Sequence, residues 1–175
     1  MSAMDDLEKS LEGVFVKQAP ALPERGKETL VEWLPWINLV LGILTLWAVY
    51  ALWHWAHMVN GLVNYLNQVS QTYGVNTGVT VHKLDSTVWL GLIVLAVEAV
   101  LYIMAFGATR ARQKRGWNLM FYALLVNLVY GFINIFTNYG GVGNFVGYLI
   151  GTVIGLWLLF QIRAKYLGKH AAPAA

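Results

Sequence analysis

The sequence predicts an all-α integral membrane protein, a four-transmembrane-helix bundle with a short amphipathic N-terminal helix. Three observations lead to this class. Of the 175 residues, 58% are hydrophobic and only 12% are charged, whereas soluble domains average about 25% charged residues. Four apolar runs each approach the roughly 20 residues that cross a bilayer. In the last run, glycine recurs at every fourth position, a spacing that lets membrane helices pack closely.

Residues 1–34 are predicted to be a cytoplasmic or interfacial amphipathic segment. Met4, Leu7 and Leu11 fall at helical spacing with charged residues between them, which is the pattern of a short amphipathic helix. Such a helix has three open placements: on the membrane surface, packed under the bundle, or bound to a partner. A second short helix is expected to begin at Pro23, because proline suits the first helical turn.

The membrane domain is expected to occupy residues 35–163. Helical spacing continues past the first span with Asn and Gln on the other face, which predicts an outer amphipathic segment over 57–84. The residues after the last span, 164–175, are expected to be a cytoplasmic tail. The four spans are predicted at about 35–56, 87–106, 117–136 and 143–163.

The positive charges predict the orientation of the chain. Of the 12 Lys and Arg residues, only Lys83 falls on the side away from the termini in the four-span topology, which leaves 11 (12 − 1) on the other side. Loops rich in Lys and Arg stay in the cytoplasm. We therefore expect a protein integral to the plasma (inner) membrane, with both termini cytoplasmic and the lipid bilayer as its first partner.

The glycine repeat predicts a helix-packing ridge. Residues four apart stack along one side of a helix, so the four glycines define a groove roughly 18 Å long. Two partners are open: the third span, which carries Gly131, or a helix outside the chain, either a copy of the same helix or another membrane protein. The ridge residues are Gly143, Gly147, Gly151 and Gly155.

A layer of polar residues is expected near the bilayer midplane. Glu98 is the one charged residue inside a predicted span, and Asn127, Thr45 and Thr152 fall at a similar depth in the other three. An acid at this depth is costly unless it is neutral or partnered. Either Glu98 handles protons or cations, or it is a neutral acid that hydrogen-bonds across helices, and the second is the interpretation we favour. Asn127 is also the first residue of a polar stripe along the third span. This stripe either packs against a neighbouring helix or lines a wet cavity.

Four residues near the outer surface are the candidates for a metal site. His54 and His57 end the first span, while His82 and Asp85 precede the second. Ligands three apart on a helix can share a metal. Histidine among tryptophans is, however, ordinary at a membrane interface, and haem needs one His from each of two helices. No metal and no cofactor are therefore expected.

The sequence carries no catalytic signature. It lacks a nucleophile elbow, a P-loop, a dinucleotide fingerprint and a zinc-protease motif. It contains no cysteine, which excludes disulfides and thiolate chemistry. Nor do basic residues interleave with aromatics on a soluble face, so nucleic-acid binding is not expected. We expect a non-enzymatic structural or accessory subunit of a membrane assembly, acting through glycine-mediated packing. The alternative is a small oligomeric transporter or channel using Glu98. A membrane enzyme or redox protein ranks third.

Overall fold

A computed structural model describes residues 3–74, 86–137 and 141–167. These residues form helices and connecting turns, with no strand among them. Four helices are long and apolar enough to cross a membrane, which confirms the all-helical class with four long helices. The elements in chain order are α1 (Ala3–Phe15), α2 (Glu24–Tyr73), α3 (Ser86–Arg110), α4 (Lys114–Asn134), α5 (Val142–Gln161) and α6 (Arg163–Tyr166).

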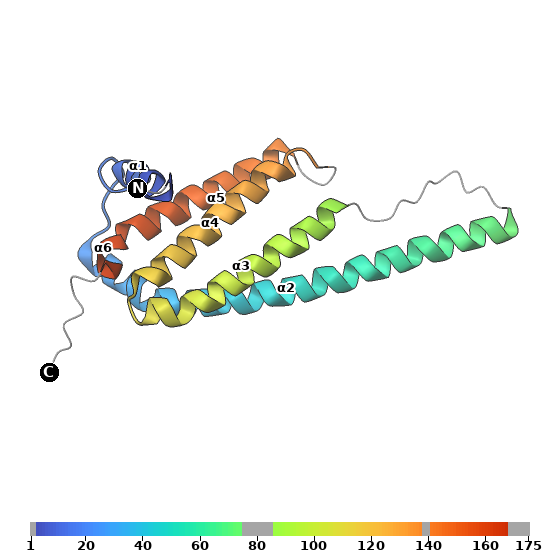
Figure 1. The fold of residues 1–175 in the computed structure, drawn as a ribbon, viewed down its shortest axis with the longest axis horizontal. Helices are drawn as coiled ribbons and strands as arrows, with labels where there is room; N and C mark the ends of the chain where they lie inside the picture. The colour runs from blue at the N-terminus through green and yellow to red at the C-terminus, as the bar shows by residue number, and fades with distance from the viewer. Residues whose placement is uncertain (1–2, 75–85, 138–140, 168–175) are drawn as a thin grey trace.

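The four long helices form two arms that meet at one end. Each packs on the next in the chain, α2 on α3, α3 on α4 and α4 on α5. In the view of Figure 1, α2 with α3 makes one arm and α4 with α5 the other, although α3 and α4 also pack on each other. Figure 1 shows the arms close together beside α1 and α6 and spread apart at the opposite end. We call these the closed end and the open end. A short turn between α3 and α4 joins the arms at the closed end.

Helix α2 is a single helix of 50 residues, or about 75 Å at 1.5 Å per residue. It begins after Pro23, whose extended backbone caps it, and ends at Gly74 with a φ of 63°, the left-handed conformation that glycine adopts at no steric cost. Pro35 lies inside it without ending it. The short helix expected after Pro23 is therefore the beginning of α2, continuous with the first span and with the amphipathic segment as far as Tyr73. The rest of that segment, 75–84, lies outside the described residues.

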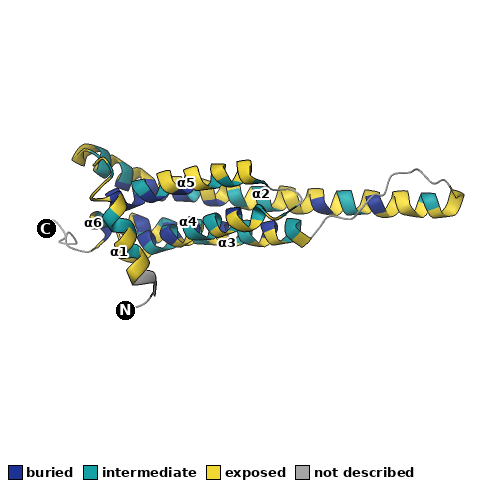
Figure 2. Ribbon diagram, turned by 90° about the horizontal axis from the view of Figure 1, so that it is seen from above, coloured by how far each residue is buried: buried dark blue, intermediate teal, exposed yellow. Residues whose placement is uncertain are grey.

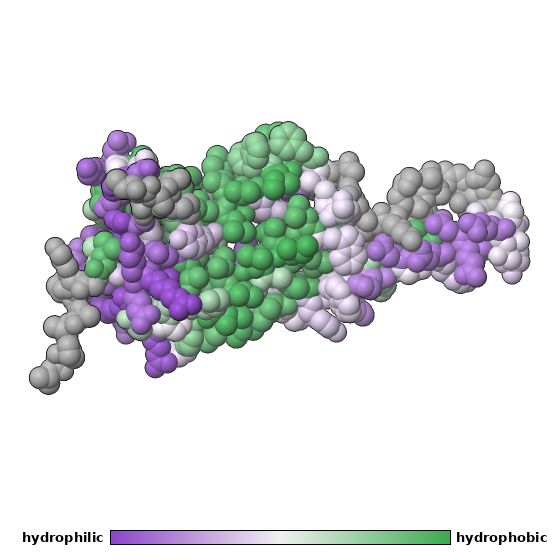
Figure 3. Space-filling view, viewed as in Figure 1, coloured by the Kyte–Doolittle hydropathy of each residue, from purple (hydrophilic) through white to green (hydrophobic). Residues whose placement is uncertain are grey.

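The surface divides into three zones along the molecule. A band of apolar side chains covers the middle of the bundle, and polar side chains gather at the closed end and along the far part of α2 (Figure 3). Large apolar side chains are exposed within the band, among them Trp47 at 69% and Val129 at 58%. Helix α2 continues beyond the other helices, and much of that extension is exposed (Figure 2). A broad exposed apolar surface of this kind is suited to contact lipid or protein.

The main hydrophobic core lies at the closed end. It joins side chains from α1, α2, α4, α5 and the residues that follow α5. The aromatic rings of Phe15 and Phe160 stack with their centroids 5.9 Å apart, and Trp117 meets Phe160 edge-on at 5.3 Å. Helix α1 is thereby packed under the bundle, one of the three placements that its amphipathic pattern left open.

Candidate functional site

Two of the four predicted midplane residues bond to each other. Glu98 of α3 is 5% exposed, and the amide Nδ2 of Asn127 on α4 donates a hydrogen bond to its Oε1 at 3.1 Å. Among the described residues no cation pairs with Glu98, and no hydrogen bond joins Thr45 or Thr152 to it. Thr152 is buried, and its hydroxyl has no partner in the part of the chain that the structure describes. The Glu98–Asn127 pair therefore links the two arms directly.

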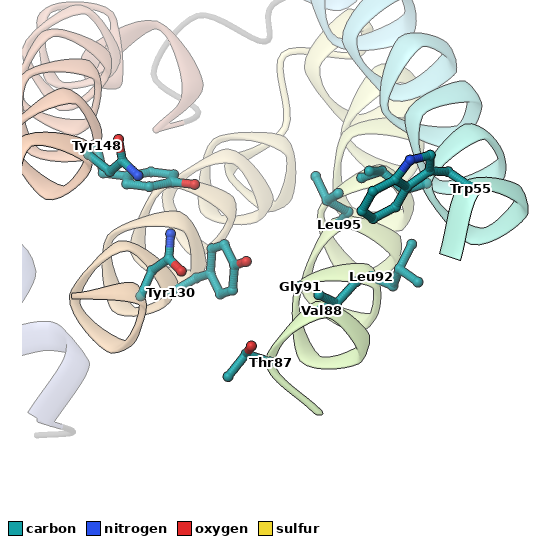
Figure 4. Close-up of a pocket in the computed structure, with 11 residues that line it drawn as sticks. Trp55, Thr87, Val88, Gly91, Leu92, Leu95, Tyr130 and Tyr148 are labelled. Carbon is teal, nitrogen blue, oxygen red and sulfur yellow. The ribbon is translucent and has the colours of Figure 1, made fainter. Parts of the chain in front are cut away.

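A cavity of about 390 Å³ opens between the arms on the open-end side of this pair. Its lining includes Leu95 on α3 and Tyr130 on α4. Leu95 is three residues from Glu98 and Tyr130 is three residues from Asn127, so each lies about one helical turn from the pair. Tyr130 points across the cavity toward α3 (Figure 4). A methyl group on Gly91 would lie 2.6 Å from the Tyr130 hydroxyl, so glycine leaves room for that hydroxyl. The polar lining residues are Thr87, Tyr130, Asn134, Asn144 and Tyr148.

The polar stripe on the third span divides between two environments. Tyr130 and Asn134 line the cavity, whereas Asn127 is engaged with Glu98. Gly131 packs directly on α5, because a methyl group there would lie 2.7 Å from the Cβ of Tyr148. The stripe therefore combines the two roles that the sequence left open: one part packs and another lines a cavity.

Most of the glycine ridge on α5 faces away from the rest of the chain. A methyl group on Gly143, Gly147 or Gly151 would meet no atom of a neighbouring described element within 4 Å. Gly155 differs, because a methyl group there would lie 2.7 Å from a methyl carbon of Leu124 on α4. The three open glycines line a shallow groove of about 520 Å³ together with Asn127, Asn144 and Tyr148. Only Gly155 and Gly131 among the five predicted packing glycines pack inside the described chain.

The two described histidines make aromatic contacts. His57 lies 4.3 Å from Trp53 and 5.5 Å from Trp89, measured between ring centroids, and His54 stacks on Tyr50 at 6.2 Å. The other two metal candidates, His82 and Asp85, lie outside the described residues. Within the described ranges, no three His, Cys, Asp or Glu side chains group as a metal site would need.

The sequence analysis missed a set of ion pairs and hydrogen bonds at the closed end, which joins the residues after Phe160 to α1. Arg163 donates to Glu8 from Nε at 2.8 Å and to Glu12 from Nη1 at 2.8 Å. The amide of Gln161 donates to the Phe15 carbonyl at 2.9 Å and accepts from the Leu22 amide at 3.2 Å. The available signal was the pair of acids four residues apart, which share one side of the amphipathic helix. Its partner lies more than 150 positions away, and no local pattern identifies it.

A second set of ion pairs ties the start of α2 to α6. Lys165 Nζ lies 2.6 Å from Glu28 and 3.3 Å from Glu24. The hydrogen bond to Glu28 raises the pKa of Lys165, and the same bond lowers the pKa of Glu28. Both shifts favour the charged forms, so these groups stay ionised around neutral pH.

Comparison of the chain with protein families, with curated proteins and with solved structures finds no match in any of the three. The functional argument therefore depends on the geometry described above. Three features enter it: the Glu98–Asn127 pair, the cavity beside that pair, and the open groove on α5.

Proposed function

We propose that this chain is a non-enzymatic subunit of a membrane assembly, and that the groove on α5 receives a transmembrane helix from outside the chain. The observation that supports this most is the open space at Gly143, Gly147 and Gly151. Each interior glycine costs a helix about 1 kcal/mol relative to alanine, and contacts within the described chain do not offset that cost. Close approach of a second backbone would do so.

Polar groups beside the groove support the same proposal. Asn127 and Asn144 line it together with the three open glycines. Asparagine side chains form hydrogen bonds between membrane helices. In this proposal the protein lies in the plasma (inner) membrane with both termini cytoplasmic, because Arg112, Arg163 and Lys165 gather at the closed end and positive residues mark the cytoplasmic side.

The test fills the groove and measures the size of the assembly. Gly147→Leu combined with Gly151→Leu should reduce the mass of the detergent-solubilised particle, because the leucines occupy the space meant for a partner helix. Thermal stability should be retained, since a Cβ atom at either position would meet no atom of another element within 4 Å.

The matched control is Val146→Leu with Ile150→Leu. These side chains are 45% and 54% exposed and are not part of the groove. The control should keep the full mass. An unchanged mass and thermal stability in the double glycine variant would mean that the groove faces lipid, and the proposal would be wrong.

A second function, proton or cation transport, is favoured by one observation: the cavity ends one turn from the Glu98–Asn127 pair. Glu98→Gln keeps a side chain that hydrogen-bonds to Asn127 but cannot carry a proton. In reconstituted vesicles with a pH-sensitive dye, this variant should lose proton flux if Glu98 transports. Flux equal to that of the parent protein would remove Glu98 from any transport mechanism.

A further inference from the structure

A second cavity lies between α2 and α5 near the closed end, away from the groove and from the Glu98 pair. Its volume is about 220 Å³, and among its lining residues only Tyr102 is polar. Leu34, Ile37 and Leu41 form the α2 wall, and Gly155 and Leu158 form the α5 wall. It shares no residue with the groove on α5.

A wider cavity of about 560 Å³ continues it toward the closed end. The two share Leu30 and Leu158, so they form one slot along α2. From Leu30 to Leu41 the apolar part extends about 17 Å at 1.5 Å per residue. That length matches the roughly 15 Å of hydrocarbon in one leaflet of a bilayer. The wider part adds Arg25, Thr29 and Trp33.

Arg25 provides an unpaired positive charge at the mouth of the slot. In the described part of the chain, Lys27, Arg112, Arg163 and Lys165 each pair with a glutamate, whereas no ion pair involves Arg25. Trp33, which lines the same cavity, is 61% exposed, as is typical of tryptophan near a membrane interface. The mouth therefore offers a cation at Arg25 and, about 12 Å further along α2, an exposed aromatic ring at Trp33.

The size and the apolar lining of the smaller cavity indicate what kind of molecule it can hold. A helix with its side chains is about 10–12 Å wide, too wide for a cavity of about 220 Å³, whereas a single acyl chain is narrow enough. A soluble polar ligand would find almost no hydrogen-bonding groups in the apolar part. Arginine forms paired hydrogen bonds with phosphate, and basic pockets between membrane helices bind anionic lipid headgroups.

We infer that this slot binds one anionic phospholipid, with an acyl chain between α2 and α5 and the phosphate at Arg25. The inference requires the bundle to lie in a membrane but not that the groove on α5 has a partner. A failure of lipid binding is therefore distinguishable from a failure of the proposed function, because each is tested with its own variants.

The test measures retained lipid by native mass spectrometry on the purified full chain. Samples are supplied with phosphatidylglycerol, with phosphatidylcholine of the same acyl chains, or with inorganic phosphate. The parent protein should retain one phosphatidylglycerol, with weaker retention of phosphatidylcholine and no retention of inorganic phosphate. Retention of inorganic phosphate equal to that of phosphatidylglycerol would overturn the assignment to a lipid.

Two pairs of variants locate the site. Leu41→Trp should fill the slot and abolish retention, whereas Val40→Trp, on the same turn but outside the slot, should retain the lipid. Ile37→Trp repeats the test at a second wall position in case Leu41→Trp does not fold. Lipid retention by both slot-filling variants equal to that of Val40→Trp would overturn the inference.

The second pair addresses the headgroup. Arg25→Gln should weaken phosphatidylglycerol binding by roughly fivefold, as expected for one cation near an anionic headgroup, and leave phosphatidylcholine unchanged. The control, Arg115→Gln, removes an exposed arginine at the start of α4 and should have no effect. Equal binding by the two arginine variants would contradict the role of Arg25.

Discussion

The closed and open ends of this bundle are built from different interactions. At the closed end, a core of aromatic and aliphatic side chains joins the first helix to the last, and ion pairs from Arg163 and Lys165 surround it. At the open end the arms separate around a cavity lined by tyrosine and asparagine. We therefore expect the stability of the bundle to depend mainly on the closed end.

The Glu98–Asn127 pair marks the boundary between the two regions. On its closed-end side the arms touch through packed side chains such as Asn38 of α2, which is fully buried and donates to the sulfur of Met120 on α4 at 3.3 Å. On the other side the nearest links are Tyr130 at Gly91 and the residues around the cavity. The pair is therefore a direct polar bond between α3 and α4 at the edge of the cavity.

The largest expected effect comes from a change at the closed end. Trp117 is 1% exposed, stacks on Phe121 at 5.3 Å, and donates from its indole nitrogen to the Leu159 carbonyl at 2.8 Å. Trp117→Ala should lower the free energy of unfolding by about 3–5 kcal/mol, because it removes a buried aromatic side chain and leaves that carbonyl without its donor. Denaturant titration in detergent measures the change.

The control for this variant is Trp47→Ala, in the exposed band. Trp47 is 69% exposed, so its loss should change the free energy of unfolding by less than about 1 kcal/mol. Equal destabilisation by the two variants would show that the closed end is not the centre of stability.

A smaller change in the free energy of unfolding is expected from Tyr166, which lies in α6 and belongs to the same core. Its side chain is 1% exposed, its hydroxyl has no hydrogen-bond partner among the described residues, and burial raises its pKa to about 12. Tyr166→Phe removes an unsatisfied polar group and should stabilise the protein by about 1 kcal/mol at neutral pH.

The same residue predicts a dependence on pH. Because its pKa is higher in the folded than in the unfolded state, its contribution to stability is complete below pH 10 and is lost as the pH rises toward 12. Thermal unfolding measured from pH 8 to 12 should show this loss in the parent protein, and the loss should be smaller in Tyr166→Phe. An identical pH profile in both would contradict the burial of the hydroxyl.

The features visible in the sequence are those that depend on neighbouring residues. Runs of apolar residues predicted the four long helices, and the helical spacing after Met58 predicted that α2 continues past the first span. Counting along the helices also placed Glu98 level with Asn127, which the structure joins by a hydrogen bond. Each of these depends only on helix geometry and hydropathy.

The rotation of each helix about its axis was not visible in the same way. Side chains facing lipid and side chains facing the core are both apolar, so their pattern does not indicate which side of α5 is inside. The glycine spacing predicted a ridge but not that Gly147 and Gly151 face outward. Ion pairs between residues far apart in the sequence, such as Arg163 with Glu8, could not be predicted for a further reason. No local sequence pattern indicates which distant residues the fold brings together.

Distances between spin labels at the two ends test this account most directly. The chain contains no cysteine, so labels attach only at introduced pairs. One pair, Thr29→Cys with Ala164→Cys, reports on the closed end, and another, Leu90→Cys with Val142→Cys, reports on the open end. All four positions are exposed. We predict a single narrow distance distribution for the first pair and a broad one for the second, measured in lipid nanodiscs by pulsed spin resonance. Equally narrow distributions at both ends would contradict a bundle held together at one end and open at the other.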